Sequence, residues 1–401
     1  MKVRRHAEEQ DFGGPVNSLP KRGNPQPTQG RVMMTFRPHS IAAVMLLSTM
    51  IYAQSSTPAS KPQGSGAAKA ASSYARYPVM SQAAEERARQ LFEMFKAGQA
   101  GAIWVTSPAE NRKLAENEKK FVATLGQWKK NLGTETKMVA ETTVPFMLKR
   151  ATIYSRLSEF ANAKVQVETV IVIDENGDTE AFNVRALPSP PEGHNAGYKD
   201  TAKLKLPFSG QWLVSQGGHG VFNNEYQMSD DEQFAIDFVL LKNGSPFEGD
   251  STKNEQFYCF GQPVLAVADG TVVRVVNDVG DNAPGKPTQD TPQGNMILIS
   301  HGNNEYSLLT NLEQNSVKLK HGDTVKQGDP VGECGNSGAS VAPKVHFQLQ
   351  NSARFPKVES LPAQFVDYIA DGKEVAVGEV VKGQMVSNGP AASTPQPPEK
   401  K

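Results

Sequence analysis

The chain has 401 residues, of which 42 are basic and 42 acidic, so it carries no formal net charge. No basic block or stripe stands out, which argues against nucleic-acid binding driven by phosphate neutralisation. The length is sufficient for two domains with their own cores plus tails, and 38% of the residues are hydrophobic. We therefore expect a multidomain protein with polar segments at its ends and between its domains.

The longest apolar run extends from Ile41 to Ala53. It is too short to cross a bilayer, which takes roughly 20 residues, so we expect no transmembrane span in the mature chain. Arg37 before the run and the small residue Ala53 at its end predict a secretory signal peptide over 34–53. We expect residues 1–33 to be a gene-model extension, with an uncleaved signal anchor as the alternative. Both interpretations predict export, to the periplasm or the extracellular space.

The chain has two cysteines, Cys259 and Cys334, and can form one intramolecular disulfide. Exported proteins favour disulfides, and two buried free thiols are the alternative. A bridge between positions 75 residues apart would stabilise the fold by about 4 kcal/mol in the chain-entropy description. We expect the disulfide.

The first half of the chain predicts a small α+β domain over 79–186, after a flexible Ser-, Ala-, Pro- and Gly-rich linker over 54–78. Helical spacing of apolar residues predicts two helices, at 81–98 and 108–132. Alternation then predicts four strands, with a Glu-Asn-Gly hairpin turn before the last, at 138–146, 151–157, 164–173 and 179–184. This helix pair followed by an antiparallel sheet resembles the nuclear-transport-factor superfamily. No convergent set of ionisable residues is evident, so we expect a binding or spacer role.

The second half predicts an all-β domain over 203–355, after a Pro-rich linker over 187–202. Short apolar segments separated by Gly, Asn and Asp predict strands at 211–215, 234–241, 263–267, 270–276, 296–301, 306–312, 330–333 and 345–349. Such regular spacing is typical of an antiparallel sandwich or barrel. The strand pattern fades over a C-terminal extension, 356–387, and residues 388–401 predict a disordered tail.

Two residues of the second domain are candidates for a site. Asp237 interrupts an apolar run, FAIDFVLL, and a carboxylate there needs a metal, a cation or several N–H donors. His346 follows a glycine-rich turn on a predicted strand, where it shares a face with Lys344. An imidazole on a rigid strand is suited to metal ligation or catalysis. A polar residue on the open face of the sheet is the alternative interpretation.

The same region contains several motifs in a fixed order: AVADGTV, a GN-strand-HGN hairpin, VKQGDPVG, and GNSG before the strand of His346. Over about 208–351 this pattern resembles the LytM/lysostaphin-type zinc endopeptidase domain. The resemblance implies an antiparallel β-sandwich in which a histidine, an aspartate and a second histidine hold zinc. The metal activates water that cleaves peptidoglycan cross-bridge peptides, and two further histidines assist.

The resemblance assigns the aspartate ligand to Asp237 and the final histidine ligand to His346. Gln233 occupies the usual position of the first histidine ligand, and His219 is the nearest candidate upstream. Asn311 and Lys344 occupy the positions of the assisting histidines. A lysine roughly 4 Å from a metal would cost about 4 kcal/mol per unit charge at an effective dielectric constant of about 20.

Two hypotheses follow. In the first, the domain is a degenerate family member in which Asp237, Asn311, Lys344 and His346 line a polar cleft. Lys344 then pairs with Asp237 or with a carboxylate of a peptidoglycan stem peptide, and the protein binds the wall or activates a separate wall hydrolase. In the second, the protein is an active endopeptidase whose zinc is held by His219, Asp237 and His346. We expect the first, and zinc is the one cofactor that the resemblance implies.

Overall fold

The computed structural model describes residues 77–109, 112, 117–191, 193, 195–229, 231–354 and 358–389. The segment 1–33, the expected signal peptide and nearly all of the first expected linker lie outside these residues, as does the expected tail from 390 onward. Within the described part of the chain, no helix has the length and apolar character needed to cross a membrane.

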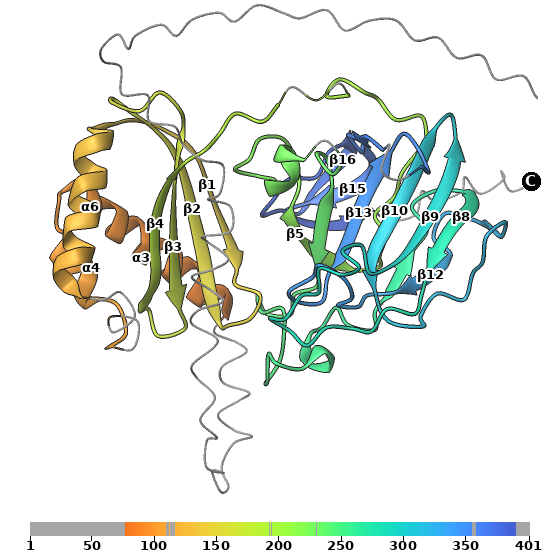
Figure 1. Ribbon diagram of the computed structural model, residues 1–401, viewed down its shortest axis with the longest axis horizontal. Coiled ribbons are helices and arrows are strands. Elements are labelled where there is room, and N and C mark those ends of the chain that lie inside the picture. Colours follow the sequence, from red (N-terminus) through yellow and green to blue (C-terminus); the bar gives the residue numbers. More distant parts are fainter. Residues whose placement is uncertain are drawn as a thin grey trace, which may run out of the picture. The chain divides into compact units, whose positions relative to one another are not determined.

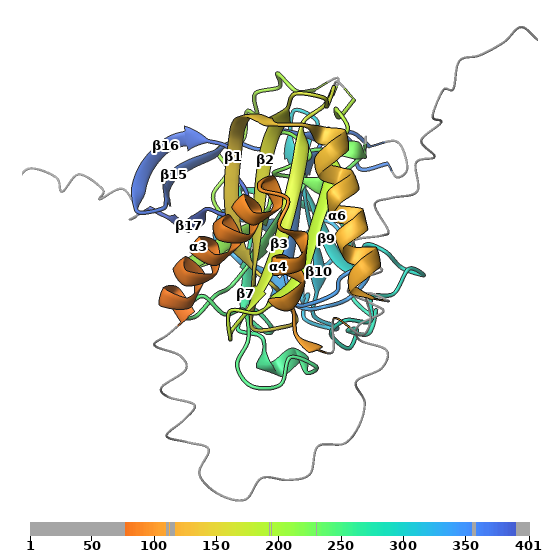
Figure 2. The same ribbon diagram turned by 90° about the vertical axis from the view of Figure 1, so that its left-hand side faces the viewer.

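The first domain consists of helices packed on an antiparallel sheet (Figure 1). Its helices and strands are α3 (Tyr77–Lys96), α4 (Ala100–Val105), α6 (Glu118–Leu132), β1 (Glu135–Pro145), β2 (Ala151–Phe160), β3 (Val167–Asp174) and β4 (Thr179–Ala186). The strands follow each other in the sheet in chain order. Figure 2 shows α3, α4 and α6 on one face of this sheet. The helix-plus-sheet arrangement agrees with the α+β prediction.

The helices differ from the prediction in two respects. The sequence predicts one helix from Pro108, whereas α6 begins at Glu118, where the side chain of Asn117 accepts a hydrogen bond from the backbone N–H of Lys120. The short helix α4 was not predicted. Its buried Ile103 joins Leu91, Phe92 and other apolar residues in the core of the first domain.

A charged network lies between α3 and the sheet, where the sequence predicted no convergent set of ionisable residues. That prediction was wrong. The guanidinium of Arg156 bonds to the carboxylates of Glu135 and Glu141 on β1, and Glu141 also accepts hydrogen bonds from Arg89 and Tyr154. The network joins two neighbouring strands to α3, where Arg89 lies 52 residues before Glu141, and the pattern of one element does not reveal such pairs. Because the network neutralises itself, it indicates a structural role.

The second domain is built on one antiparallel sheet of eleven strands and a separate two-stranded ribbon. The sheet strands are β5 (Gln211–Gln216), β6 (Ile236–Val239), β8 (Gly270–Val276), β9 (Asn295–Gly302), β10 (Glu305–Leu312), β11 (Thr324–Val325), β13 (Val345–Gln350), β14 (Ser360–Leu361), β15 (Phe365–Ala370), β16 (Lys373–Gly378) and β17 (Met385–Asn388). The ribbon pairs β7 (Pro263–Leu265) with β12 (Pro330–Glu333). Two short 3₁₀ helices, η1 (Glu225–Met228) and η2 (Asn254–Gln256), lie in the loops.

The central strands run in the order β8-β9-β10-β13-β6-β5 (Figure 1). Their inward side chains form a single large core with the ribbon, in which Trp212 stacks on Phe208 and the Phe208 ring packs edge-on against Phe238. The two central strands β6 and β13 carry Asp237 and His346. The core therefore fixes the backbone that presents both candidate residues.

The C-terminal extension is part of this sheet, which the fading sequence pattern did not predict. β17 pairs with β5, and β15 pairs with β17 and with β16. β17 ends at Asn388, the residue at which the sequence predicts the tail to begin, and the Asn388 side chain bonds to the backbone of Leu206 and Phe208. The extension thus covers the edge of the sheet that β5 would otherwise expose.

The end of the expected linker 187–202 is fixed to β10. The buried carboxylate of Glu305 accepts hydrogen bonds from the Tyr198 hydroxyl, from the backbone and hydroxyl of Thr201, and from the backbone of Ala202. Close by, the Asp200 carboxylate accepts a hydrogen bond from the backbone N–H of Gln364. This end of the linker is therefore ordered by side-chain contacts.

Candidate functional site

The pairing of β6 with β13 places two candidate residues opposite each other. His346 is the direct cross-strand partner of Asp237, and Lys344 comes just before β13. Residues two apart on a strand share a face, so Lys344 and His346 both reach the side of the sheet on which Asp237 lies. The alternation predicted from the sequence is confirmed here by the contacts.

These three side chains form a closed hydrogen-bonded cluster with Tyr226. Asp237 Oδ1 lies 2.8 Å from His346 Nδ1, and Asp237 Oδ2 lies 2.7 Å from Lys344 Nζ. The hydroxyl of Tyr226 donates to the same Oδ2 at 2.9 Å and accepts from Lys344 Nζ at 3.1 Å. Asp237 and His346 are buried, and 17% of the Lys344 side chain is exposed. Both carboxylate oxygens of Asp237 therefore have partners from the chain itself.

Tyr226 was not predicted from the sequence. It lies on η1, in the loop between β5 and β6, and Asn224 caps η1 by accepting a hydrogen bond from the Tyr226 N–H. Asn224 also donates to the backbone carbonyls of Gln233 and Ala235, which holds the loop against the start of β6. The Tyr226 ring contacts His346 edge-on, with ring centroids 5.2 Å apart. The one local signal for this arrangement is the capping asparagine, which does not identify what the loop covers.

The ionisation of the cluster follows from its contacts. Burial acts to raise the pKa of Asp237, but the ammonium of Lys344 and the hydrogen bond with His346 outweigh it and hold that pKa well below its usual range. Burial acts to lower the pKa of Lys344, but the charge of Asp237 outweighs it and raises that pKa. Burial raises the pKa of Tyr226. At neutral pH the cluster therefore holds a carboxylate, an ammonium and a neutral phenol.

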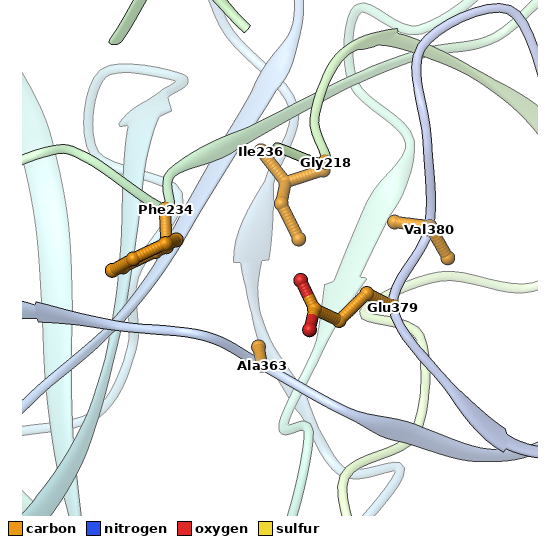
Figure 3. A pocket seen from close by; sticks show the side chains of 6 residues that line it. All are labelled: Gly218, Phe234, Ile236, Ala363, Glu379 and Val380. Carbon is orange, nitrogen blue, oxygen red and sulfur yellow. The ribbon is translucent and has the colours of Figure 1, made fainter. Parts of the chain in front are cut away.

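The other candidate metal ligand, His219, lies in a different environment. Its Nε2 pairs with the carboxylate of Glu379 at 2.8 Å, and its ring contacts Phe234 edge-on. Figure 3 shows the Glu379 carboxylate beside Ile236 and Ala363 in a small pocket that Gly218 also lines. Ile236 precedes Asp237 and faces the core, so this pocket lies on the opposite face of β6 from the cluster.

Asn311 lies near the cluster but does not join it. Its backbone φ is 61°, its side chain is buried, and its Nδ2 donates to the carbonyl of Ser337 at 2.8 Å. The Asn311 carbonyl accepts from Gly335, whose own carbonyl accepts from the N–H of Lys344. Asn311 is thus separated from Lys344 by Gly335, and its side chain fixes the glycine-rich turn.

The expected disulfide is present. Cys259 and Cys334 are bonded, with Cα atoms 5.8 Å apart, and both are buried in the core of the second domain. Cys334 directly precedes Gly335, and its carbonyl accepts a hydrogen bond from Gly261. The bridge therefore anchors the start of the turn that leads to Lys344.

The donor set does not fit a zinc ion. Zinc in a catalytic site takes three protein ligands with free lone pairs and an open position for water. Here both Asp237 oxygens are engaged, and the ammonium of Lys344 lies against one of them. Across the described ranges, no three His, Cys, Asp or Glu side chains gather closely enough to hold a metal ion. We therefore derive no metal-dependent step from this site.

The sequence of the second domain matches Peptidase family M23 over residues 255–357. This chain carries a peptidase family M23 domain. The LytM-type resemblance drawn from the motif order is thus confirmed.

Two curated relatives are similar to part of this chain. An uncharacterized metalloprotease of Haemophilus influenzae is 31% identical over 94 residues, which cover 23% of this chain and 17% of the relative. Peptidoglycan DD-endopeptidase ShyA of Vibrio cholerae is 28% identical over 125 residues, 29% of this chain and 26% of the relative. The chain thus matches about a quarter or less of the length of either relative.

Among solved structures, a mutant catalytic domain of the prophage-encoded M23 protein EnpA from Enterococcus faecalis aligns with 39% of this chain and 93% of its own length. The sequence identity is 20% and the TM-score 0.25.

Proposed function

We propose that this chain is an exported protein that acts at the bacterial cell wall through an M23 domain that binds without cleaving. The observation that carries the proposal is the pairing of Lys344 with Asp237 at 2.7 Å in a buried cluster. The charge of this carboxylate is compensated by an ammonium, and its oxygens accept further hydrogen bonds from a phenol and an imidazole, so it is satisfied without a metal. Without a metal the site lacks the activated water that M23 hydrolysis requires.

The proposed ligand is peptidoglycan, through its stem peptides. M23-family membership and the peptidoglycan endopeptidase among the relatives support this choice. An ammonium has three donors, and Lys344 uses two of them, toward Asp237 and Tyr226. The remaining donor of Lys344 is suited to a carboxylate of a stem peptide. The protein that binds these peptides would act by activating a separate wall hydrolase.

The same proposal assigns roles to the other segments of the chain. We assign residues 34–53 to an export signal and 79–186 to a binding or spacer domain. We assign the sheet and ribbon of 203–355 to the LytM-type sandwich. The alternative, an active endopeptidase with His219, Asp237 and His346 as ligands, has no contact in its favour, because His219 pairs with Glu379.

The test is a sedimentation assay with purified cell walls, combined with chromatography of the soluble fragments. The wild-type protein is expected to sediment with the walls and to release no fragments, with or without added zinc. Lys344→Gln removes the ammonium and keeps a polar side chain that is one atom shorter, and it is expected to bind the walls more weakly. Release of peptide fragments by the wild type, or wall binding that is absent throughout, would refute the proposal.

A further inference from the structure

The ammonium of Lys344 has the surroundings of a bound cation. It lies 2.7 Å from a carboxylate oxygen and 3.1 Å from a phenolic oxygen, and its nitrogen is 5.8 Å from the centre of the Tyr226 ring. The pair it forms with Asp237 is shielded from water by Tyr226 and by the buried His346. One positive charge in a pocket of oxygen and nitrogen donors is what a metal ion would provide there.

The spacing of the two remaining donors supports this comparison. Two ligands of a tetrahedral zinc, each about 2.0–2.1 Å from the ion, lie about 3.3 Å apart. Asp237 Oδ1 and His346 Nδ1 lie 2.8 Å apart on paired strands. At this distance the two atoms are hydrogen-bonded to each other, so the paired strands hold a carboxylate oxygen and an imidazole nitrogen side by side, close to the spacing that two ligands of one ion need.

We propose that Lys344 is a built-in replacement for a metal ion, and that this one side chain closes a latent metal site. Asp237 and His346 are already placed as two ligands. Lys344 occupies the third direction and brings a charge of the wrong sign for metal binding. This inference deepens the proposed function, since it names the residue that makes the site metal-free, and it is testable without any wall-binding assay.

The proposal predicts that a substitution at Lys344 creates metal affinity. Lys344→His removes the ammonium and adds a nitrogen ligand on the same face of β13, next to Asp237. Removing a like charge next to the ion and adding a ligand should strengthen zinc binding by at least about 100-fold over the wild type. Lys344→Gln removes the charge without adding a strong ligand, so a smaller gain is expected.

The experiment is calorimetric titration of the full-length protein with zinc chloride, with cobalt absorption spectra to report the coordination geometry. The wild type is expected to show no saturable uptake, and Lys344→His one tetrahedral site per chain. The matched control is Lys344→His combined with Asp237→Asn, which keeps the new histidine and removes the carboxylate. That control is expected to lose the uptake.

If Lys344→His does not fold, the melting temperature of Lys344→Gln is measured with and without zinc. Zinc is expected to raise the melting temperature of Lys344→Gln, because the ion replaces the missing positive charge. The melting temperature of the wild type is expected to stay unchanged. The inference is overturned if neither variant responds to zinc, or if uptake by Lys344→His persists without the Asp237 carboxylate. A Lys344→His variant that takes up no zinc would overturn this inference and leave the proposed wall binding intact, whereas a wild-type protein that does not sediment with the walls would refute the proposed function and leave this inference intact.

Discussion

Replacing Lys344 with methionine should be among the most destabilising single changes in the M23 domain. Methionine fills a similar volume but leaves the buried carboxylate of Asp237 without its cation. Removing one partner of a buried ion pair usually costs about 3–5 kcal/mol. Asp237 keeps its hydrogen bonds to Tyr226 and His346, each worth about 1.5–3 kcal/mol to a charged group. We therefore expect a loss at the lower end of that range, about 3 kcal/mol.

The pH of the measurement follows from the two pKa shifts. The pKa of Asp237 is lowered by folding, so its contribution to stability is complete above about pH 4 and is lost as the pH falls. The pKa of Lys344 is raised, so its contribution is complete below about pH 10 and is lost as the pH rises. Urea unfolding at pH 7 therefore measures the full effect of the pair. The fluorescence of Trp212 is a suitable signal, because it is buried on β5 beside β6.

The double variant Lys344→Met with Asp237→Asn is the control, since it removes both charges together. It should be more stable than the sum of the two single changes predicts, by about 2–3 kcal/mol. A Lys344→Met variant within about 0.5 kcal/mol of the wild type would behave like a surface substitution. That result would refute the conclusion that the pair is buried and mutually dependent.

Three other changes test separate parts of the fold. Burial and the neighbouring charge of Glu305 raise the pKa of Asp200 to about 6, so folding stability should fall as the pH rises from about 4 to about 6. Asp200→Asn should then gain about 1 kcal/mol at pH 7, allowing for partial exposure, and nothing below about pH 4, as followed by melting temperature against pH. Cys259→Ser together with Cys334→Ser opens a 75-residue loop and should cost about 4 kcal/mol in urea unfolding. Gly335→Ala places a Cβ against the backbone of residues 312 and 313, and should lower the unfolding free energy by about 2 kcal/mol or more in the same assay.

The strands were predictable because their signals are local. Alternation and turn glycines predicted β8 and β12 at their observed bounds, and the Glu175-Asn176-Gly177 turn joins β3 to β4 as expected. α4 escaped prediction because six residues are too few to show helical periodicity. β15, β16 and β17 escaped it because β17 is stabilised by pairing with β5, about 170 residues earlier in the chain. No local pattern carries that information.

The site was predictable in part because some of its signals are also local in the sequence. Asp237 was identified as an isolated carboxylate in an apolar strand, and Lys344 and His346 as neighbours on one strand face. Of the two pairings expected for Lys344, the structure has the one with Asp237. Tyr226 completes the cluster through a loop whose course depends on Asn224 and on contacts far along the chain. Its position could not be inferred from spacing.

The zinc content of the purified wild-type protein tests the central claim most directly. After dialysis against zinc-containing and then zinc-free buffer, mass spectrometry of the metal should give the same trace amount for the wild type and for Asp237→Asn. That result is expected because Lys344 already neutralises the only carboxylate in the cluster of described residues. One zinc per wild-type chain, lost in Asp237→Asn, would contradict the account.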